Sequence, residues 1–214
     1  MKFFVNSQKP IITPLVFLGT YAVVTSTVLQ NILTFENLTT ILTVLAIVPV
    51  CLVISQAYNK ILNALAVQHR TTISRTWKFQ LFMNFEIAII AALGSLPMLR
   101  TENSMDQYSI TGNLSIISLY IIIAVSLASS LRMLTELPVF SILLVLVLLI
   151  ADYIHLIVVP EVLFYYTFVL TGSLPEIQAI TRLLLYSGVM LLFYRVCALI
   201  TAERDVLPDE SRQS

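Results

Sequence analysis

Charged residues are scarce in this chain of 214 residues: lysine, arginine, aspartate and glutamate together make up 11%. A soluble domain carries about a quarter of such residues, and so few ionisable groups cannot cover the surface of a soluble globule of this length. Hydrophobic residues reach 58% of the chain, which is the reverse of the composition of disordered proteins. The composition therefore predicts an integral membrane protein, with the lipid bilayer as its surroundings.

An excess of positive charge is also missing, since twelve basic residues balance twelve acidic ones. A protein that binds nucleic acid needs surplus lysine and arginine to neutralise phosphates, so no nucleic-acid partner is expected. Cysteine is rare as well: Cys51 and Cys197 both lie within apolar runs, without a CxxC pair. Neither a disulfide framework nor a zinc site is predicted. The five glycines form no phosphate-binding loop and no catalytic motif is present, so we expect no cofactor, no metal and no enzymatic activity.

Long apolar runs are what the chain has in abundance. A helix needs about 20 apolar residues to cross the hydrocarbon core of a bilayer. Six runs are close to that length, and none alternates as the strands of a membrane barrel do. These runs cover residues 11–30, 40–58, 79–99, 114–131, 138–159 and 181–201. We expect an all-α integral membrane protein in which residues 1–214 form a single six-helix transmembrane bundle, with a short polar tail at 202–214.

The distribution of basic residues predicts how these spans are oriented, because cytoplasmic loops are enriched in lysine and arginine. If both termini are cytoplasmic, ten basic residues fall on the cytoplasmic side and two, Arg100 and Arg182, fall outside. An odd number of spans would move Arg204 and Arg212 to the outside. The predicted topology is therefore six spans with the N-terminus and the C-terminus inside.

The third span has two unlike sides. On a helical wheel, one side gathers small or amide side chains, namely Asn84, Ala88, Ala92 and Ser95, and Glu86 falls on the opposite side. Small residues allow two helices to approach closely within a membrane. We therefore predict that the small-residue side of this span packs against another helix.

Ionisable residues inside spans are functional candidates because burying a charge is costly. Glu86 lies about 12 Å along the helix axis from Lys78, which is too deep for a short side chain to reach water. We expect Glu86 to lie inside the bundle with a polar partner on the sixth span, where Arg195 is the natural candidate and Gly188 would admit a neighbouring helix. Two alternatives remain: Arg195 extends to the inner headgroups, or Glu86 couples a proton or an ion.

The fifth span holds an acid and an imidazole on one face, since Asp152 and His155 are three residues apart. Such a pair can relay a proton. The simpler interpretation is a polar cap at the outer end of the span, paired with Arg182. The other histidine, His69, lies on the opposite side of the membrane, so this pair predicts no metal site.

The middle of the chain resembles bacterial Yip1-domain membrane proteins. The resemblance covers roughly residues 40–150 and is carried by the stretch ISRTWKFQLFMNFEIAIIAALGSLPML after a basic loop, and by ISLYIIIAVSLASSLRMLTELPVFSILLVLVLL. The sixth span is additional to the five that are usual in that family. The resemblance implies a small multi-pass protein of the bacterial cytoplasmic (inner) membrane, concerned with membrane organisation or transport, and it implies no catalytic residues.

Three kinds of function are compatible with these features. The first is a non-enzymatic protein that acts through helix contacts with a protein partner or with further copies of itself, either Yip1-like or as the immunity protein against a membrane-targeting toxin. The second is the permease subunit of an exporter that works with a separate ATPase. The third is a proton-linked carrier that uses Glu86 or Asp152, for which inverted repeats or broken helices would be expected.

Overall fold

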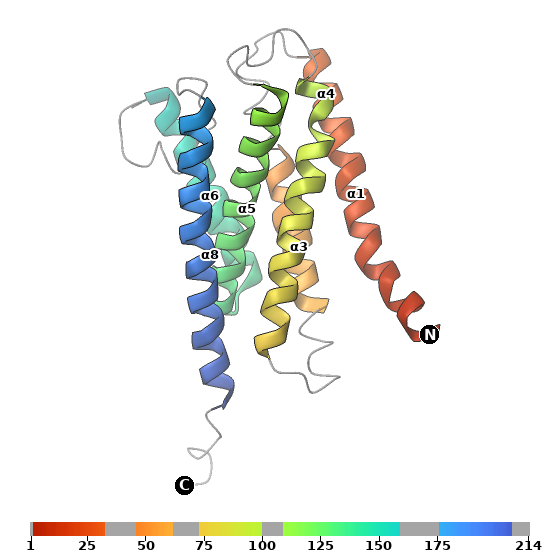
Figure 1. Ribbon diagram of the computed structural model, residues 1–214, viewed down its shortest axis with the longest axis vertical. Helices are drawn as coiled ribbons and strands as arrows, with labels where there is room; N and C mark the ends of the chain where they lie inside the picture. Colours follow the sequence, from red (N-terminus) through yellow and green to blue (C-terminus); the bar gives the residue numbers. More distant parts are fainter. Residues whose placement is uncertain (1, 33–45, 62–72, 100–108, 159–175, 207–214) are drawn as a thin grey trace.

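The computed structural model describes residues 2–32, 46–61, 73–99, 109–158 and 176–206, and these segments are helical apart from a few linking residues. The helices are α1 (Lys2–Ile32), an unlabelled helix (Ala46–Ile61), α3 (Ile73–Gly94), α4 (Leu96–Leu99), α5 (Ile110–Thr135), α6 (Pro138–Val158) and α8 (Glu176–Val206). Figure 1 shows them side by side along one common direction, with the start of α1 and the end of α8 at the same end of the molecule. The described residues contain no strand, so the all-α prediction is confirmed for them.

Three of these helices contain segments long and apolar enough to cross a membrane: Ile12–Leu29 in α1, Ile110–Thr135, which is all of α5, and Glu176–Thr201 in α8. Two shorter apolar segments, Ala46–Ile61 and Pro138–Leu148, lie beside them. By length and composition these segments are compatible with insertion into a membrane, as the sequence predicts. The first six residues of the predicted second span, 40–45, lie outside the described residues.

The ends of α5 are defined by local hydrogen bonds. Ser109 caps its first turn, because the Ser109 hydroxyl accepts a hydrogen bond from the backbone N–H of Gly112 at 3.0 Å. At the other end Glu136 adopts a left-handed conformation with φ of 59°, and its N–H donates to the carbonyl of Arg132. Such a residue terminates a helix. Pro138 then begins α6, at a position where its missing N–H is of no consequence.

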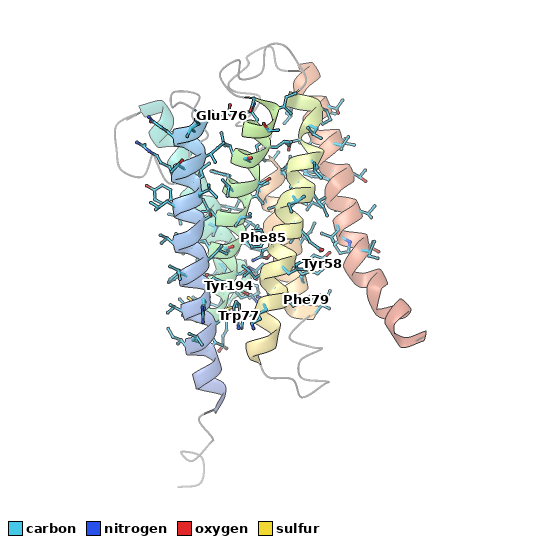
Figure 2. All side chains as sticks on the ribbon, viewed as in Figure 1. Tyr58, Trp77, Phe79, Phe85, Glu176 and Tyr194 are labelled. Atoms are coloured by element: carbon cyan, nitrogen blue, oxygen red, sulfur yellow. The ribbon has the colours of Figure 1, made fainter. Side chains whose placement is uncertain are left out.

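A carboxylate from α8 completes the start of α5. The Ser109 backbone N–H and hydroxyl both donate to Glu176, at 2.8 and 2.7 Å. Negative charge is favoured near the N-terminus of a helix, where backbone N–H groups are unpaired. The contact joins the beginnings of α5 and α8, and Figure 2 shows Glu176 at that end of the two helices.

The third predicted span is a helix with a break. Pro97 has no N–H to donate, so the regular pattern of α3 stops at Gly94, and the short α4 follows after Ser95. The Ser95 hydroxyl donates to the carbonyl of Ala91 at 2.9 Å and stabilises the last turn of α3. The break lies beside α1, which packs against both α3 and α4.

The helix α5 is the centre of the bundle. In its most apolar 18-residue stretch 67% of the residues are buried, against 28% and 17% in the corresponding stretches of α8 and α1. It packs against α3, α6 and α8. The helix α8 also touches α3, where the Tyr194 hydroxyl donates to the carbonyl of Trp77 at 3.2 Å and the two rings lie 6.4 Å apart (Figure 2). Many large apolar side chains of α1 and α8 are exposed on the outside of the bundle, as a lipid environment requires, whereas Leu18 and Leu183 are buried in the core.

Candidate functional site

The most unusual feature of the interior is a group of hydrogen-bonded polar side chains between three helices. Ser55 comes from the helix Ala46–Ile61, Gln80 and Asn84 come from α3, and Ser129 comes from α5. All four are buried, with 2% or less of each side chain exposed. We call these four residues the polar cluster. Because a polar group in an apolar interior must find a partner, their mutual contacts determine how the three helices pack.

The amide groups of α3 connect the polar cluster. The Ser55 hydroxyl donates to Asn84 Oδ1 at 2.9 Å, and Gln80 Nε2 donates to Asn84 Oδ1 at 3.1 Å and to the Ser55 carbonyl at 3.2 Å. Asn84 Nδ2 reaches the Ser129 hydroxyl at 3.4 Å, and the Ser55 and Ser129 hydroxyls are also 3.4 Å apart. All of these groups are neutral amides and hydroxyls. The cluster can therefore bind polar groups by hydrogen bonding, but it contains no acid or base for proton transfer.

A second polar contact lies one turn beyond the cluster, toward the end of α5. Arg132 Nη1 donates to the Gln56 carbonyl at 2.6 Å and to Gln56 Oε1 at 2.8 Å. Arg132 is half-buried, whereas Gln56 is buried. This contact links the last turn of α5 to the helix Ala46–Ile61 and places a cation beside the cluster.

Three buried polar atoms in this region form no hydrogen bond with the described residues. They are Gln80 Oε1, Gln56 Nε2 and the Ser126 hydroxyl oxygen. Ser126 lies one turn before Ser129 on α5, so one of these atoms flanks the cluster on the side away from Arg132. A buried polar atom without a partner is costly, and it marks a position where another polar group is needed.

The predicted small-residue side of α3 faces the interior. Asn84, Ala88 and Ser95 are fully buried and Ala92 is 2% exposed. On the other side, Phe82 and Leu93 are more than half exposed. The sequence-based division of this helix therefore coincides with the buried and exposed sides that the structure shows.

The structure does not bring Glu86 together with Arg195, the partner expected on the sixth span. Glu86 is half-buried on α3. Arg195 is exposed on α8, and among the described side chains no ion pair joins it to Glu86. Gly188 is exposed too, and a side chain added there would touch nothing within 4 Å, so no described helix of the bundle packs on it. The reason is that α8 packs mainly on α5 and turns this side outward.

Comparison of the chain with protein-family models, with curated proteins and with solved structures found no match. The function of the site must therefore be argued from its geometry.

The predicted pair Asp152 and His155, with Arg182, stays a prediction. Asp152 and His155 belong to the backbone of α6, but their side chains lie outside the described residues. Arg182 is half-buried near the beginning of α8. Among the side chains that the structure describes, no group of three histidine, cysteine or acidic residues could hold a metal ion.

The sequence analysis missed most of the polar cluster, since it singled out Asn84 alone. Ser55, Gln80 and Ser129 lie in or beside apolar runs, and because they are uncharged, they do not stand out there as ionisable residues do. One signal was available: the run Ser126, Ser129, Ser130 within an otherwise apolar helix is typical of a helix that packs closely against others in a membrane.

Proposed function

We propose that the protein is a six-span membrane protein, with both termini in the cytoplasm, that acts through helix contacts with a protein partner or a second copy. The observation that supports this proposal is that the buried polar side chains are engaged with one another. Those of the polar cluster bond to one another across three helices and hold the inner helices in place. The outer helices expose broad apolar sides that can face lipid or another protein.

The exposed side of α8 is the best candidate surface for such contacts. Leu185, Leu192 and Ile177 are each more than 60% exposed, on a helix that is the longest described together with α1. Bilayer lipids are as apolar as these side chains, so association in a membrane depends on close packing and not on the hydrophobic effect. The exposed Gly188 lies between Leu185 and Leu192 and would let a partner helix approach.

The Yip1-like interpretation gives this proposal its biological context. A small multi-pass protein of the bacterial inner membrane, without chemistry of its own, would serve membrane organisation or transport by assembling with other proteins. The two stretches that carry the resemblance contain α3 and the part of α5 from Ile117 onward, which provide Gln80, Asn84 and Ser129. The part of the chain with the family-like layout is thus also the inner part of the bundle.

Site-specific photo-crosslinking in native membranes tests the proposal. A photoreactive residue is placed at Leu185, Leu192 or Val16, which are exposed, and at Ile121 or Ala128, which are buried in α5. We expect discrete adducts heavier than one chain from the α8 positions and none from the buried controls. Lipid adducts alone at every exposed position would contradict the proposal, as would substrate turnover or flux by the purified protein in liposomes without a partner.

A further inference from the structure

A continuous series of buried polar side chains lies on the inner helices in the half of the bundle near Arg132. Going from Arg132 into the interior, Gln56 is followed by the polar cluster and then by Ser126. On α5 the distance from Arg132 to Ser126 is six residues, or about 9 Å along the helix axis. Each helical turn along this route therefore offers at least one buried polar group.

The other half of the interior is apolar where it meets Ser126. From Ile121 to Val125, α5 contributes aliphatic side chains alone, and four of these five are fully buried. On α3 the turns after Asn84 bury Ile87 and Ala91. The polar route is therefore closed at one end by aliphatic packing. Its other end, at the half-buried Arg132, is accessible.

The unpartnered atoms lie along this route. Gln80 Oε1, Gln56 Nε2 and the Ser126 hydroxyl are buried and form no hydrogen bond with described residues. Gln80 and Gln56 belong to residues that are 2% and 6% exposed, and Ser126 is fully buried. The cost of an unpaired polar atom in an apolar interior is large enough that native structures place a water molecule there.

We propose that water enters the bundle beside Arg132 and follows the polar cluster as far as Ser126, which makes this half of the bundle a blind, hydrated path. Water is the ligand that fits, because it both donates and accepts. Gln80 Oε1 needs a donor, Gln56 Nε2 needs an acceptor, and the Ser126 hydroxyl can serve as either. The neutral amides and hydroxyls around it would hold water without binding an ion firmly. The path does not depend on the proposed partner contacts.

Cysteine accessibility tests the path in the full-length protein. In a chain with Cys51→Ala and Cys197→Ala, cysteine replaces Ser126 or Ser129 on the path. As controls of the same depth it replaces Ala124 or Ala128, which are fully buried on the opposite side of α5. A small, charged, membrane-impermeant thiol reagent is applied to sealed vesicles. It is added on the side where Lys60→Cys reacts, since Lys60 is exposed at the same end as Arg132.

The rates of modification decide between a wet and a dry interior. The reactive form of a cysteine is the thiolate, which apolar surroundings suppress, so Ser126→Cys and Ser129→Cys should react at least about tenfold faster than the alanine-site controls. Rates equal to those controls, or labelling from the other side alone, would overturn the proposal. If a cysteine variant fails to fold, an experimental structure of the unmodified protein decides instead. Ordered water within hydrogen-bonding distance of Gln80 Oε1 and Ser126 supports the path, and apolar packing around both atoms refutes it.

Discussion

At the scale of single residues, Gly94 sets how closely α1 approaches the end of α3. A Cβ atom added at Gly94 would overlap the Ala22 side chain of α1 and come within 3.3 Å of the Gly19 carbonyl. The Ser26 hydroxyl of α1 also donates to the Gly94 carbonyl at 3.0 Å. The two backbones are therefore in direct contact, and this contact leaves no space for a side chain.

Gly94→Ala should destabilise the protein by about 1–3 kcal/mol, because the overlap forces α1 and α3 apart. The matched control is Gly188→Ala, since nothing lies within 4 Å of that position. The control should be neutral, or stabilising by up to about 1 kcal/mol, because alanine is the better helix former. Unfolding in detergent micelles measures both variants. Equal stability of the two would show that α1 does not pack as described.

Glu136 is the second residue whose backbone matters, because it ends α5 in the left-handed region with φ of 59°. That conformation costs a residue with a side chain about 1–2 kcal/mol, whereas glycine adopts it freely. Glycine also gives the unfolded chain more conformational freedom, which offsets part of this gain. Glu136→Gly should therefore stabilise the fold by about 0.5–1 kcal/mol. Glu136→Val should destabilise it, because a branched side chain fits this region poorly. A higher melting temperature for Glu136→Val than for Glu136→Gly would contradict the left-handed conformation of this residue.

At the scale of helices, the buried side of α3 depends on small side chains. Ala88 and Ala92 face the interior, where the core leaves little unfilled space. Ala88→Leu or Ala92→Leu should cost about 1–3 kcal/mol and lower the yield of folded protein. Ala57→Leu is the control, since Ala57 is exposed on the helix Ala46–Ile61 and should change stability by less than about 0.5 kcal/mol. A normal yield of both Ala88→Leu and Ala92→Leu would show that this side of α3 does not pack closely in the bundle.

The helix scale is also where the sequence was most informative. The helical wheel of α3 separates a buried side from an exposed side, because the periodicity of small and large side chains within one helix is a local property. The neighbour of Glu86 could not be found in that way, since it depends on which helices are adjacent. The sequence favoured Arg195, but α8 packs mainly on α5 and Arg195 is exposed there. Pairings between helices are set by the packing of the whole bundle.

The polar cluster escaped prediction for a related reason. A serine in an apolar helix usually bonds to its own backbone, as Ser130 does to the Ser126 carbonyl at 2.8 Å. Nothing in the sequence separates that serine from Ser129, which contacts Asn84 of another helix. The difference arises from which side of α5 meets α3, and three-dimensional packing alone determines it.

At the scale of the whole molecule, burial and polarity are arranged together. The central α5 is buried on most sides, and it has polar neighbours at both ends, with Glu176 at its start and Gln56 near its last turn. The outer helices α1 and α8 expose apolar side chains over most of their length. A bundle of this kind is suited to lipid around its circumference, with polar contacts confined to the interior and the ends.

The arrangement of the ends leads to the last prediction, which concerns the number of crossings and their orientation. The start of α1 and the end of α8 lie at the same end of the bundle (Figure 1), as an even number of crossings requires. The basic residues predict that this end is cytoplasmic. A reporter active only in the cytoplasm should therefore work when fused after Ser214 or within residues 62–72, and fail when inserted within 101–112. A reporter active only outside should give the opposite pattern. If the reporters after Ser214 and within 101–112 lie on the same side of the membrane, the six-span arrangement is ruled out. If every reporter lies on the side opposite to the expected one, the six spans remain but their orientation is reversed.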